Sequence, residues 1–411
     1  MSIFFCLFKI IKLKNRHNLY HIFCLLFINS IEKVVDKCYN KIVGEHMSNQ
    51  FKIIVMSNFK DRGKIIGEYI KQNLKTDDSN LIYAKNERFQ NGEGKVVLTE
   101  SVRNKIVFII SDVSNYGETY KMYGHVNHMS PDEHFQDIKR TISAIAGKAK
   151  KIIVIMPLLY QSRQHRRLMR ESLDCAMALQ DLEHLGVDSV LTFDAHDINI
   201  QNAVSRMSFD SFFPNYQVMK TLLKKEDFKI DKDNMIVISP DTGAMQRAIK
   251  YANMLGLDVG MFYKRRDYTQ IVNGKNPVVQ HEYLGRDVKG KYILIVDDMI
   301  ASGGSVIDVA TEMKKRGALG AYIVATFSFF TDGIEKFEDA YKKGIIKKIY
   351  TTNLTYLPNE YKGKLWICLV DCLEFLARII TNIIEGQSIS YLVDSDEKIK
   401  ELLIEHNRHL K

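Results

Sequence analysis

Short apolar runs rich in Val and Ile alternate along the chain with segments of helical periodicity, and this alternation constrains the fold most strongly. Segments such as Glu171–Leu185 and Ser305–Arg316 have apolar residues every three or four positions. Seven runs have strand length: Phe51–Val55, Ile106–Ile110, Ile152–Met156, Val190–Phe193, Met235–Ile238, Val259–Tyr263 and Tyr292–Val296. Such strands, separated by helices, predict an α/β fold with mainly parallel sheets flanked by helices.

An internal echo indicates that the sequence contains two related halves. The segment Val102–Ser114 (VRNKIVFIISDVS) parallels Val288–Ser302 (VKGKYILIVDDMIAS), and both read as a turn, a buried strand and an acidic loop. A chain of 411 residues also has the usual length of two domains. We therefore predict domains at 47–209 and 210–360, followed at 361–411 by a strand, an apolar helix and a terminal amphipathic helix.

The first 46 residues differ from the rest of the chain. They are apolar, but the longest stretch without charged residues, His17–Ile31, is shorter than a bilayer requires. Basic residues do not lead the stretch and no small-residue cleavage site follows, so a secretory signal is not predicted. Two interpretations remain: an amphipathic membrane anchor, or a translated upstream stretch that is not part of the working protein, which would begin at Met47. We favour the second and expect no stable membrane insertion.

Charge and cysteine usage exclude several classes of protein. The formal charge is +9, and residues 1–46 contribute +4 of it through seven Lys/Arg and three Asp/Glu. The remaining excess suits small anionic substrates, and no long basic block favours nucleic acid. The six cysteines lack zinc-finger spacing and are too sparse for a disulfide framework, as expected in a reducing cytoplasm. Cys368 and Cys372 are predicted to share one helix face.

Polar side chains follow five of the predicted strands. In open α/β sheets, ligands bind beyond the carboxyl ends of the strands. Cations together with carboxylates and an imidazole at one such edge predict a site for polyphosphate and metal. The groups that follow the strands are Arg163, Gln164, Arg166, Arg167, Arg170, Asp194, His196, Asp241, Gly243, Lys264, Arg265, Arg266, Asp297 and Asp298.

The sharpest motif is VDDMIASGGSVIDVATEM, from Val296 to Met313. A buried strand ends in two adjacent carboxylates, and a Gly-Gly turn then leads into an amphipathic helix that Gly317 is expected to stop. Backbone N–H groups of such a turn, together with the helix N-terminus, favour a bound phosphate. The motif is neither a P-loop nor a dinucleotide-binding fingerprint, because GK[ST] and GxGxxG are absent from it.

At this motif the sequence resembles the type I phosphoribosyltransferase fold, and specifically the ribose-phosphate pyrophosphokinase family. The resemblance covers about Phe51 to Val393. It implies two tandem phosphoribosyltransferase-like domains, each a mainly parallel sheet with flanking helices. The matching segments, in order, are RFQNGE (Arg88–Glu93), SRQHRR (Ser162–Arg167), FDAHDINIQ (Phe193–Gln201), SPDTGAMQRA (Ser239–Ala248), YKRRD (Tyr263–Asp267) and VDDMIASGGS.

The resemblance implies roles for individual residues in a reaction of ATP with ribose 5-phosphate. Lys264 would be catalytic, with Arg266 beside it, and His196 and Asp241 would serve a Mg²⁺ site. ATP would contact Phe89, Asn91, Glu93, Arg163 and Gln164, with the first three reaching in from a neighbouring subunit. Ribose 5-phosphate would be held by Asp297, Asp298, Ala301, Ser302, Gly303, Gly304 and Ser305. The family works as homo-oligomers, often hexamers, in nucleotide biosynthesis in the cytoplasm.

Three positions depart from the family pattern. Asn91 and His165 stand where Asp is common, and Ala301 replaces a third acidic residue in the ribose-phosphate loop. The loss at Ala301 leaves open a non-catalytic regulatory paralogue. A base-specific phosphoribosyltransferase is a further alternative, although SRQHRR and RFQNGE favour ATP. Each site residue also has a structural alternative: Lys264 a plain surface lysine, His196 a hydrogen-bonded structural imidazole, and Phe89 a core residue.

Overall fold

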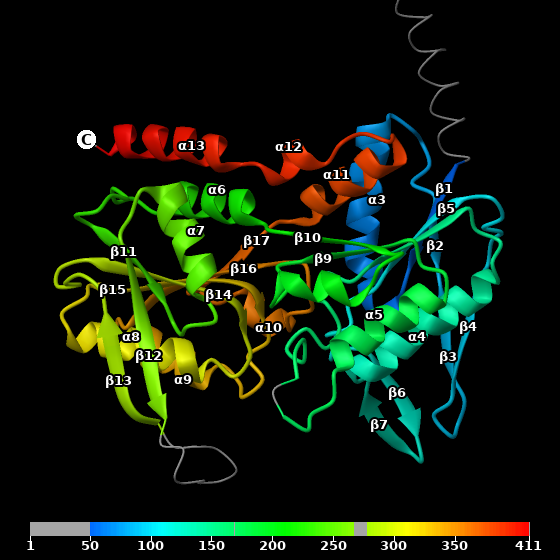
Figure 1. Cartoon of the computed structure of the whole chain (residues 1–411), viewed down its shortest axis with the longest axis horizontal. Coiled ribbons are helices and arrows are strands. Elements are labelled where there is room, and N and C mark those ends of the chain that lie inside the picture. Colours follow the sequence, from blue (N-terminus) through cyan, green and yellow to red (C-terminus); the bar gives the residue numbers. More distant parts are fainter. Residues whose placement is uncertain (1–49, 168, 267–277, 411) are drawn as a thin grey trace, which may run out of the picture.

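The computed structural model describes residues 50–167, 169–266 and 278–410, which form two sheets side by side with helices on both faces of each (Figure 1). The stretch 1–46, and with it our expectation that it is not part of the working protein, lies outside the described residues.

The first sheet has six parallel strands in the order β10-β9-β8-β5-β1-β2. Helix α3 (Lys60–Leu74) packs on one face, and α4 (Pro131–Ile145) and α5 (Asp174–His184) pack on the other. A capping box between Ser130 and Glu133 starts α4. The strands are β1 (Phe51–Val55), β2 (Leu81–Tyr83), β5 (Ile106–Ile110), β8 (Lys151–Ile155), β9 (Ser189–Phe193) and β10 (Ser208–Phe212).

Two short hairpins project from this half at the same side of the molecule (Figure 1). The first joins β3 (Lys85–Arg88) to β4 (Gly94–Val97), and the second joins β6 (Thr119–Met122) to β7 (His125–His128). Both are antiparallel, and both lie outside the apolar runs found in the sequence.

The second sheet has seven strands in the order β13-β12-β11-β14-β15-β16-β17, all parallel except β13. The strands are β11 (Met235–Ser239), β12 (Val259–Arg266), β13 (Val278–Leu284), β14 (Tyr292–Ile300), β15 (Gly320–Ser328), β16 (Ile346–Thr352) and β17 (Ile367–Val370). Helices α6 and α7 cover one face, and α8 and α9 cover the other. The helices of this half are α6 (Asn215–Lys225), α7 (Met245–Leu255), α8 (Gly304–Lys315), α9 (Glu335–Lys342) and α10 (Asn359–Lys362).

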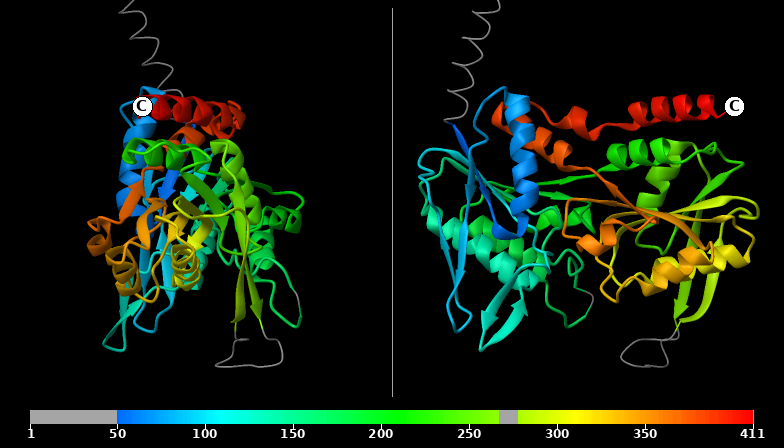
Figure 2. Two further views of the ribbon diagram at one scale, coloured as in Figure 1. Left: turned by 90° about the vertical axis from the view of Figure 1, so that its left-hand side faces the viewer. Right: turned by 180° about the vertical axis from the view of Figure 1, so that it is seen from behind.

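The carboxyl-terminal segment runs along one side of both halves (Figures 1 and 2). Helix α11 (Leu373–Ile384) follows β17 and packs against α3 of the first half. After the short α12 (Ser390–Val393), helix α13 (Asp396–His409) packs against α6 and α7. One continuous apolar cluster therefore includes residues of both sheets and of this segment.

The predicted α/β class is confirmed, and each of the seven apolar runs coincides with a strand, although Met156 falls just beyond β8, and β12 and β14 extend several residues past their runs. The prediction that Cys368 and Cys372 share one helix face is wrong, because Cys368 lies in β17 and Cys372 precedes α11. The domain boundaries stay a prediction, and the division at 209/210 falls inside β10.

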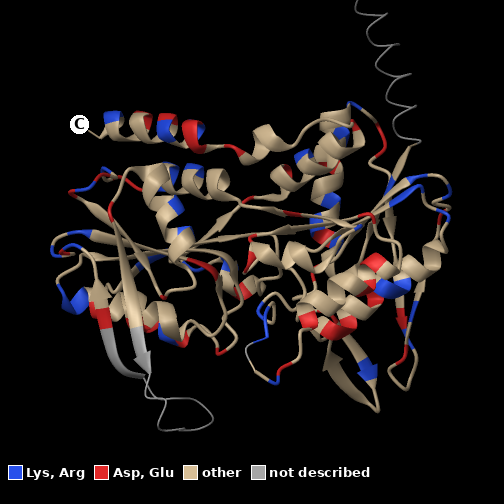
Figure 3. Cartoon of the chain, viewed as in Figure 1, with Lys and Arg blue, Asp and Glu red and all other residues tan. Residues whose placement is uncertain are grey.

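Lys and Arg are interspersed with Asp and Glu along the elements drawn in Figure 3, including along α13. Within the described residues, no helix is both long enough and apolar enough to cross a bilayer.

Candidate active site

The two halves meet in a hydrogen bond between predicted site residues. His196 lies in the loop after β9 of the first sheet, and Asp298 lies near the end of β14 in the second. The His196 Nδ1 atom is 2.7 Å from Asp298 Oδ2. This hydrogen bond raises the pKa of His196, against the opposing effects of burial and of the charges of Arg247 and Arg163. These two residues, which lie at strand ends of different sheets, are therefore in contact, as expected from the sequence.

The Asp297–Asp298 pair follows the buried part of β14, where four apolar residues lead the chain out to the sheet edge. The Asp298 amide donates to Asp297 Oδ1 at 2.9 Å, and the Met299 amide donates to Asp298 Oδ1 at 2.9 Å. Burial and the neighbouring Asp298 charge raise the pKa of Asp297. Burial also acts on Asp298, but its bond to His196 and the Arg247 charge outweigh burial and lower its pKa. The two carboxyls thus differ in proton affinity. They also differ in access, because Asp298 is 2% exposed and accepts at both oxygens, whereas Asp297 is only half-buried.

The loop after β14 turns sharply into α8. Gly303 has φ 82°, and a Cβ there would collide with the Phe337 ring, so only glycine fits. Gly304 opens α8, and a Cβ there would meet no atom within 4 Å. The start of α8 therefore faces open space, where its backbone N–H groups and dipole favour an anion. This geometry fits the predicted phosphate loop of Ala301, Ser302, Gly303, Gly304 and Ser305.

Asp241 lies between β11 and α7, at the same edge of the second sheet. Its Oδ1 accepts from the backbone N–H groups of Gly243 (2.9 Å) and Ala244 (3.1 Å), and its charge contributes to the raised pKa of Asp297. The described residues contain no group of three or more His, Cys, Asp or Glu that could hold a metal alone. Proteins usually bind Mg²⁺ through one or two side chains together with substrate phosphates, so the exposed carboxylate of Asp241 fits that ion.

Lys264 and Arg266 lie near the end of β12, which neighbours β11 in the second sheet. Their backbones pair with His281 and Val278 of β13 in an antiparallel hairpin. Their side chains lie outside the described part of the structure, so the catalytic assignment stays a prediction.

Phe89, Asn91 and Glu93 form the tip of the β3–β4 hairpin, at the far edge of the first half from α8 (Figures 1 and 2). Phe89 is 54% exposed, which rules out the alternative of a core residue. The Phe89 amide donates to the Glu93 carbonyl at 2.8 Å, and the Glu93 amide donates to Asn91 Oδ1 at 3.2 Å. At the base of the hairpin, Arg88 donates to buried Asp137 of α4 at 2.7 Å. The tip is thus a closed, firmly anchored loop of the first half, away from the other predicted groups.

Arg163 and Gln164 lie in the segment between β8 and α5. Arg163 is exposed and near enough to His196 for its charge to affect that pKa. Gln164 donates to the Ser172 carbonyl at 2.8 Å and so closes its own loop. His165, where the family commonly has Asp, contacts Asp197 at 3.4 Å and lies against the His196 ring.

Arg247 is a component of this junction that the sequence analysis did not single out. It lies in α7, and its guanidinium donates twice to Asp194 Oδ1, at 3.0 and 2.6 Å. Arg247 stands within the SPDTGAMQRA segment, and Asp194 directly follows β9. Nothing in the sequence pairs the two, because their contact spans the two halves.

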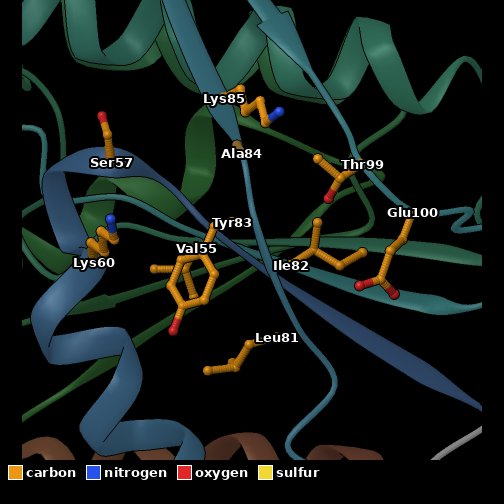
Figure 4. Close-up of a pocket in the computed structure, with 10 residues that line it drawn as sticks. All are labelled: Val55, Ser57, Lys60, Leu81, Ile82, Tyr83, Ala84, Lys85, Thr99 and Glu100. Carbon is orange, nitrogen blue, oxygen red and sulfur yellow. The ribbon is translucent and has the colours of Figure 1, made fainter.

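A separate cavity of about 410 Å³ lies at the β2 edge of the first sheet (Figure 4). Ser57, Lys60, Tyr83 and Lys85 are among its lining residues, and none of the predicted site residues lines it. The candidate active site is consequently defined by the convergence of strand ends at the junction.

Comparison with known proteins decides the family. A model of the N-terminal domain of ribose phosphate pyrophosphokinase matches residues 51–186, and a model of the phosphoribosyl transferase domain matches residues 213–355. The chain belongs to the ribose-phosphate pyrophosphokinase family. The family's two-domain architecture is the one described above, with the matched regions in the first and second sheets.

Curated relatives and a solved structure agree with this membership. A ribose-phosphate pyrophosphokinase from Chlorobaculum tepidum is 26% identical, over 88% of this chain and 100% of the relative. One from Fusobacterium nucleatum is 29% identical, over 74% of this chain and 88% of the relative. The crystal structure of phosphoribosylpyrophosphate synthetase from Mycobacterium smegmatis has a TM-score of 0.63 at 20% identity, and the match covers 82% of this chain and 99% of that chain. This last likeness shows the fold.

Proposed function

We propose that this protein transfers the pyrophosphoryl group of ATP to the 1-hydroxyl of ribose 5-phosphate, giving phosphoribosyl pyrophosphate and AMP for nucleotide biosynthesis. The main structural support is the junction itself: His196 of the first half contacts Asp298 of the second, beside Asp297 and the glycine loop before α8. A nucleotide held by the first half and a sugar phosphate held by the second would meet at this contact. Family membership supplies the reaction type.

In the proposed mechanism, ribose 5-phosphate binds at the second sheet. Its 5-phosphate would accept hydrogen bonds from the loop of residues 301–305 and the start of α8. Its ring hydroxyls would donate to the carboxyl groups of the half-buried Asp297 and of its neighbour Asp298. This holds the 1-hydroxyl in one orientation toward the nucleotide, and orientation supplies a large part of the rate in phosphoryl transfer.

The chemical step joins the ribose 1-oxygen to the β-phosphorus of ATP and breaks the bond between that phosphorus and the bridging oxygen to the α-phosphate. AMP leaves with that oxygen, and the hydroxyl proton is released. Lys264 and Arg266 would stabilise negative charge that develops on the transferring group. Mg²⁺, held by Asp241 and His196 together with ATP, would neutralise phosphate charge.

The proposal extends to assembly and location. The exposed hairpin tip of Phe89, Asn91 and Glu93 lies far from the second half of its own subunit, so we propose that it completes the ATP site of a neighbouring copy. A homo-oligomer, with a hexamer as our expectation, follows from that arrangement. We place the protein in the cytoplasm, where ATP and ribose 5-phosphate are available, and the described cysteines are free thiols.

The deciding experiment measures AMP release from ATP by the purified full-length chain, with ribose 5-phosphate and Mg²⁺ present. We expect one phosphoribosyl pyrophosphate for each AMP, and no AMP when the sugar is omitted. ATP binding without turnover under any Mg²⁺ or phosphate condition would favour the regulatory paralogue, an alternative that Ala301 keeps open. Consumption of phosphoribosyl pyrophosphate with a free base, and no AMP, would instead identify a base-specific phosphoribosyltransferase.

A further inference from the structure

The Arg247–Asp194 ion pair is almost entirely enclosed at the junction of the two halves. The Arg247 side chain is 13% exposed and that of Asp194 is 4% exposed. Asp194 Oδ2 also accepts from the Thr326 hydroxyl of β15. Both carboxylate oxygens of a first-half residue are therefore held by side chains of the second half. The Arg247 contact is two-pronged because two guanidinium N–H groups converge on Asp194 Oδ1, an arrangement that a lysine ammonium does not reproduce.

The backbone at Asp194 is fixed in an uncommon conformation. Its φ is 42°, in the left-handed region that residues other than glycine rarely adopt. Its amide also donates to the Phe212 carbonyl at 2.8 Å. The side-chain contacts to Arg247 and Thr326 hold this turn in place from the other half.

The turn at Asp194 carries the site residue His196 two positions later, and His196 in turn contacts Asp298 at 2.7 Å. The Arg247 guanidinium thus fixes the turn that carries one partner of the His196–Asp298 contact while remaining largely shielded from solvent.

We propose that Arg247 is a positioning residue for ribose 5-phosphate, which clamps the Asp194 turn so that His196 stays against Asp298 and the paired carboxylates keep their binding geometry. This inference rests on the proposed function for the identity of the ligand. Arg247 needs no contact with substrate in this role. Its loss loosens the His196 loop, and a carboxylate displaced by a fraction of an ångström binds the sugar less well.

The test compares Arg247→Lys with a matched control, Arg62→Lys. Arg62 forms a similarly enclosed ion pair with Asp112 in the first half, at 2.6 Å and with side chains 16% and 0% exposed. Lysine keeps the charge of both residues but cannot reproduce the two-pronged contact of Arg247. For Arg247→Lys we expect KM for ribose 5-phosphate to rise about tenfold and KM for ATP to stay within about twofold. Arg62→Lys should leave both KM values within about twofold of wild type. The two lysine variants should lower Tm by similar amounts.

Calorimetric titration with ribose 5-phosphate provides a readout that does not depend on turnover. The dissociation constant should rise about tenfold in Arg247→Lys and stay nearly unchanged in Arg62→Lys. If Arg247→Lys does not fold, Thr326→Val removes one of the donors to Asp194 without changing charge, and an increase of about threefold is expected.

The outcomes separate the two proposals. Equal sugar affinity in both lysine variants, or a drop in Tm without any change in sugar binding, overturns the positioning role. If the wild-type chain binds ribose 5-phosphate but releases no AMP, the proposed reaction is wrong, and the titrations still decide whether Arg247 positions the sugar site.

Discussion

The two sheets end in the same motif but use it differently. In the first, β5 leads to Asp112, whose carboxylate is completely buried and accepts from Arg62, from Ser114 and from the Tyr356 amide of the second half. In the second, β14 leads to Asp297 and Asp298, beside an open loop and the start of α8. The two similar sequence segments therefore form equivalent strands that each end in an acidic residue, but the surroundings of the carboxylates differ.

The difference shows what turns a strand end into a site. At Asp112 the protein supplies its own donors, so the carboxylate fastens Tyr356 and the second half to the first. At the end of β14, Asp298 also accepts from a residue of the other half, His196, but the adjacent Asp297 is only half-buried and lies beside the glycine loop, where we expect the ligand. The comparison predicts that mutations after β5 lower mainly the stability of the protein, and that mutations at the substrate-binding side of the second sheet lower mainly turnover.

The largest effect is expected at Lys264, in β12 of the second half. Lys264→Ala should lower turnover about 10²–10³-fold, since it removes a cation that stabilises charge on the transferring group. AMP release at saturating ATP and ribose 5-phosphate measures this, with thermal unfolding as the control for folding. Near-normal turnover would contradict the catalytic assignment.

The next largest effect is expected on the stability of the protein, from a mutation at Asp112 after β5 of the first sheet. Asp112→Asn leaves Arg62 without a charged partner, and the free energy of unfolding should fall by about 3 kcal/mol. Urea unfolding measures the loss. KM for ribose 5-phosphate should stay within about twofold of wild type. A selective loss of sugar affinity here would mean that both strand ends serve the substrate.

A smaller gain is expected from restoring the acidic residue that the ribose-phosphate loop lacks. Ala301→Asp adds a carboxylate beside the paired aspartates, and kcat/KM for ribose 5-phosphate should rise about fivefold if that group aids binding. Steady-state kinetics with varied sugar tests this, and Ala301→Asn controls for size. A decrease would indicate that added negative charge repels the phosphate.

The smallest effect concerns the pH dependence of stability. Because burial and Asp298 raise the pKa of Asp297 in the folded state, the folded protein holds a proton that the unfolded chain loses near pH 4. Stability from this group is present at low pH and declines as pH rises through the raised pKa. Asp297→Asn, which cannot ionise, should therefore raise Tm at pH 8 by about 2 °C or more. Differential scanning calorimetry at pH 5 and pH 8 checks that the gain grows with pH.

Much of the framework could be predicted because apolar strands leave a direct trace in sequence. Val/Ile runs marked strands of both sheets, and β15 (GAYIVATFS) carries the same signal. The hairpins did not show it, because strands such as KNER and HVNH are polar and form through local pairing. Cys368 was misplaced since its apolar run contains both a strand and a helix, which periodicity does not separate.

The residues of the candidate site also fall into a group that the sequence predicts and a group that it does not. Asp297, Asp298 and the glycine loop are adjacent in sequence, so their common position was predictable. Arg247 and Asp194 are 53 residues apart and belong to different halves, and their contact depends on how the sheets dock. Composition and spacing carry no information about such a contact, which only the folded arrangement supplies.

The packing of α11 on α3 has a consequence for synthesis on the ribosome. Helix α3 is made early, yet the surface that covers part of it lies more than 300 residues later in the chain. While the chain is still being translated, that apolar face has no partner of its own to rest against. The nascent first half is therefore expected to recruit chaperones until the last helices emerge, and nascent chains stalled before α11 should be more sensitive to protease than the released protein.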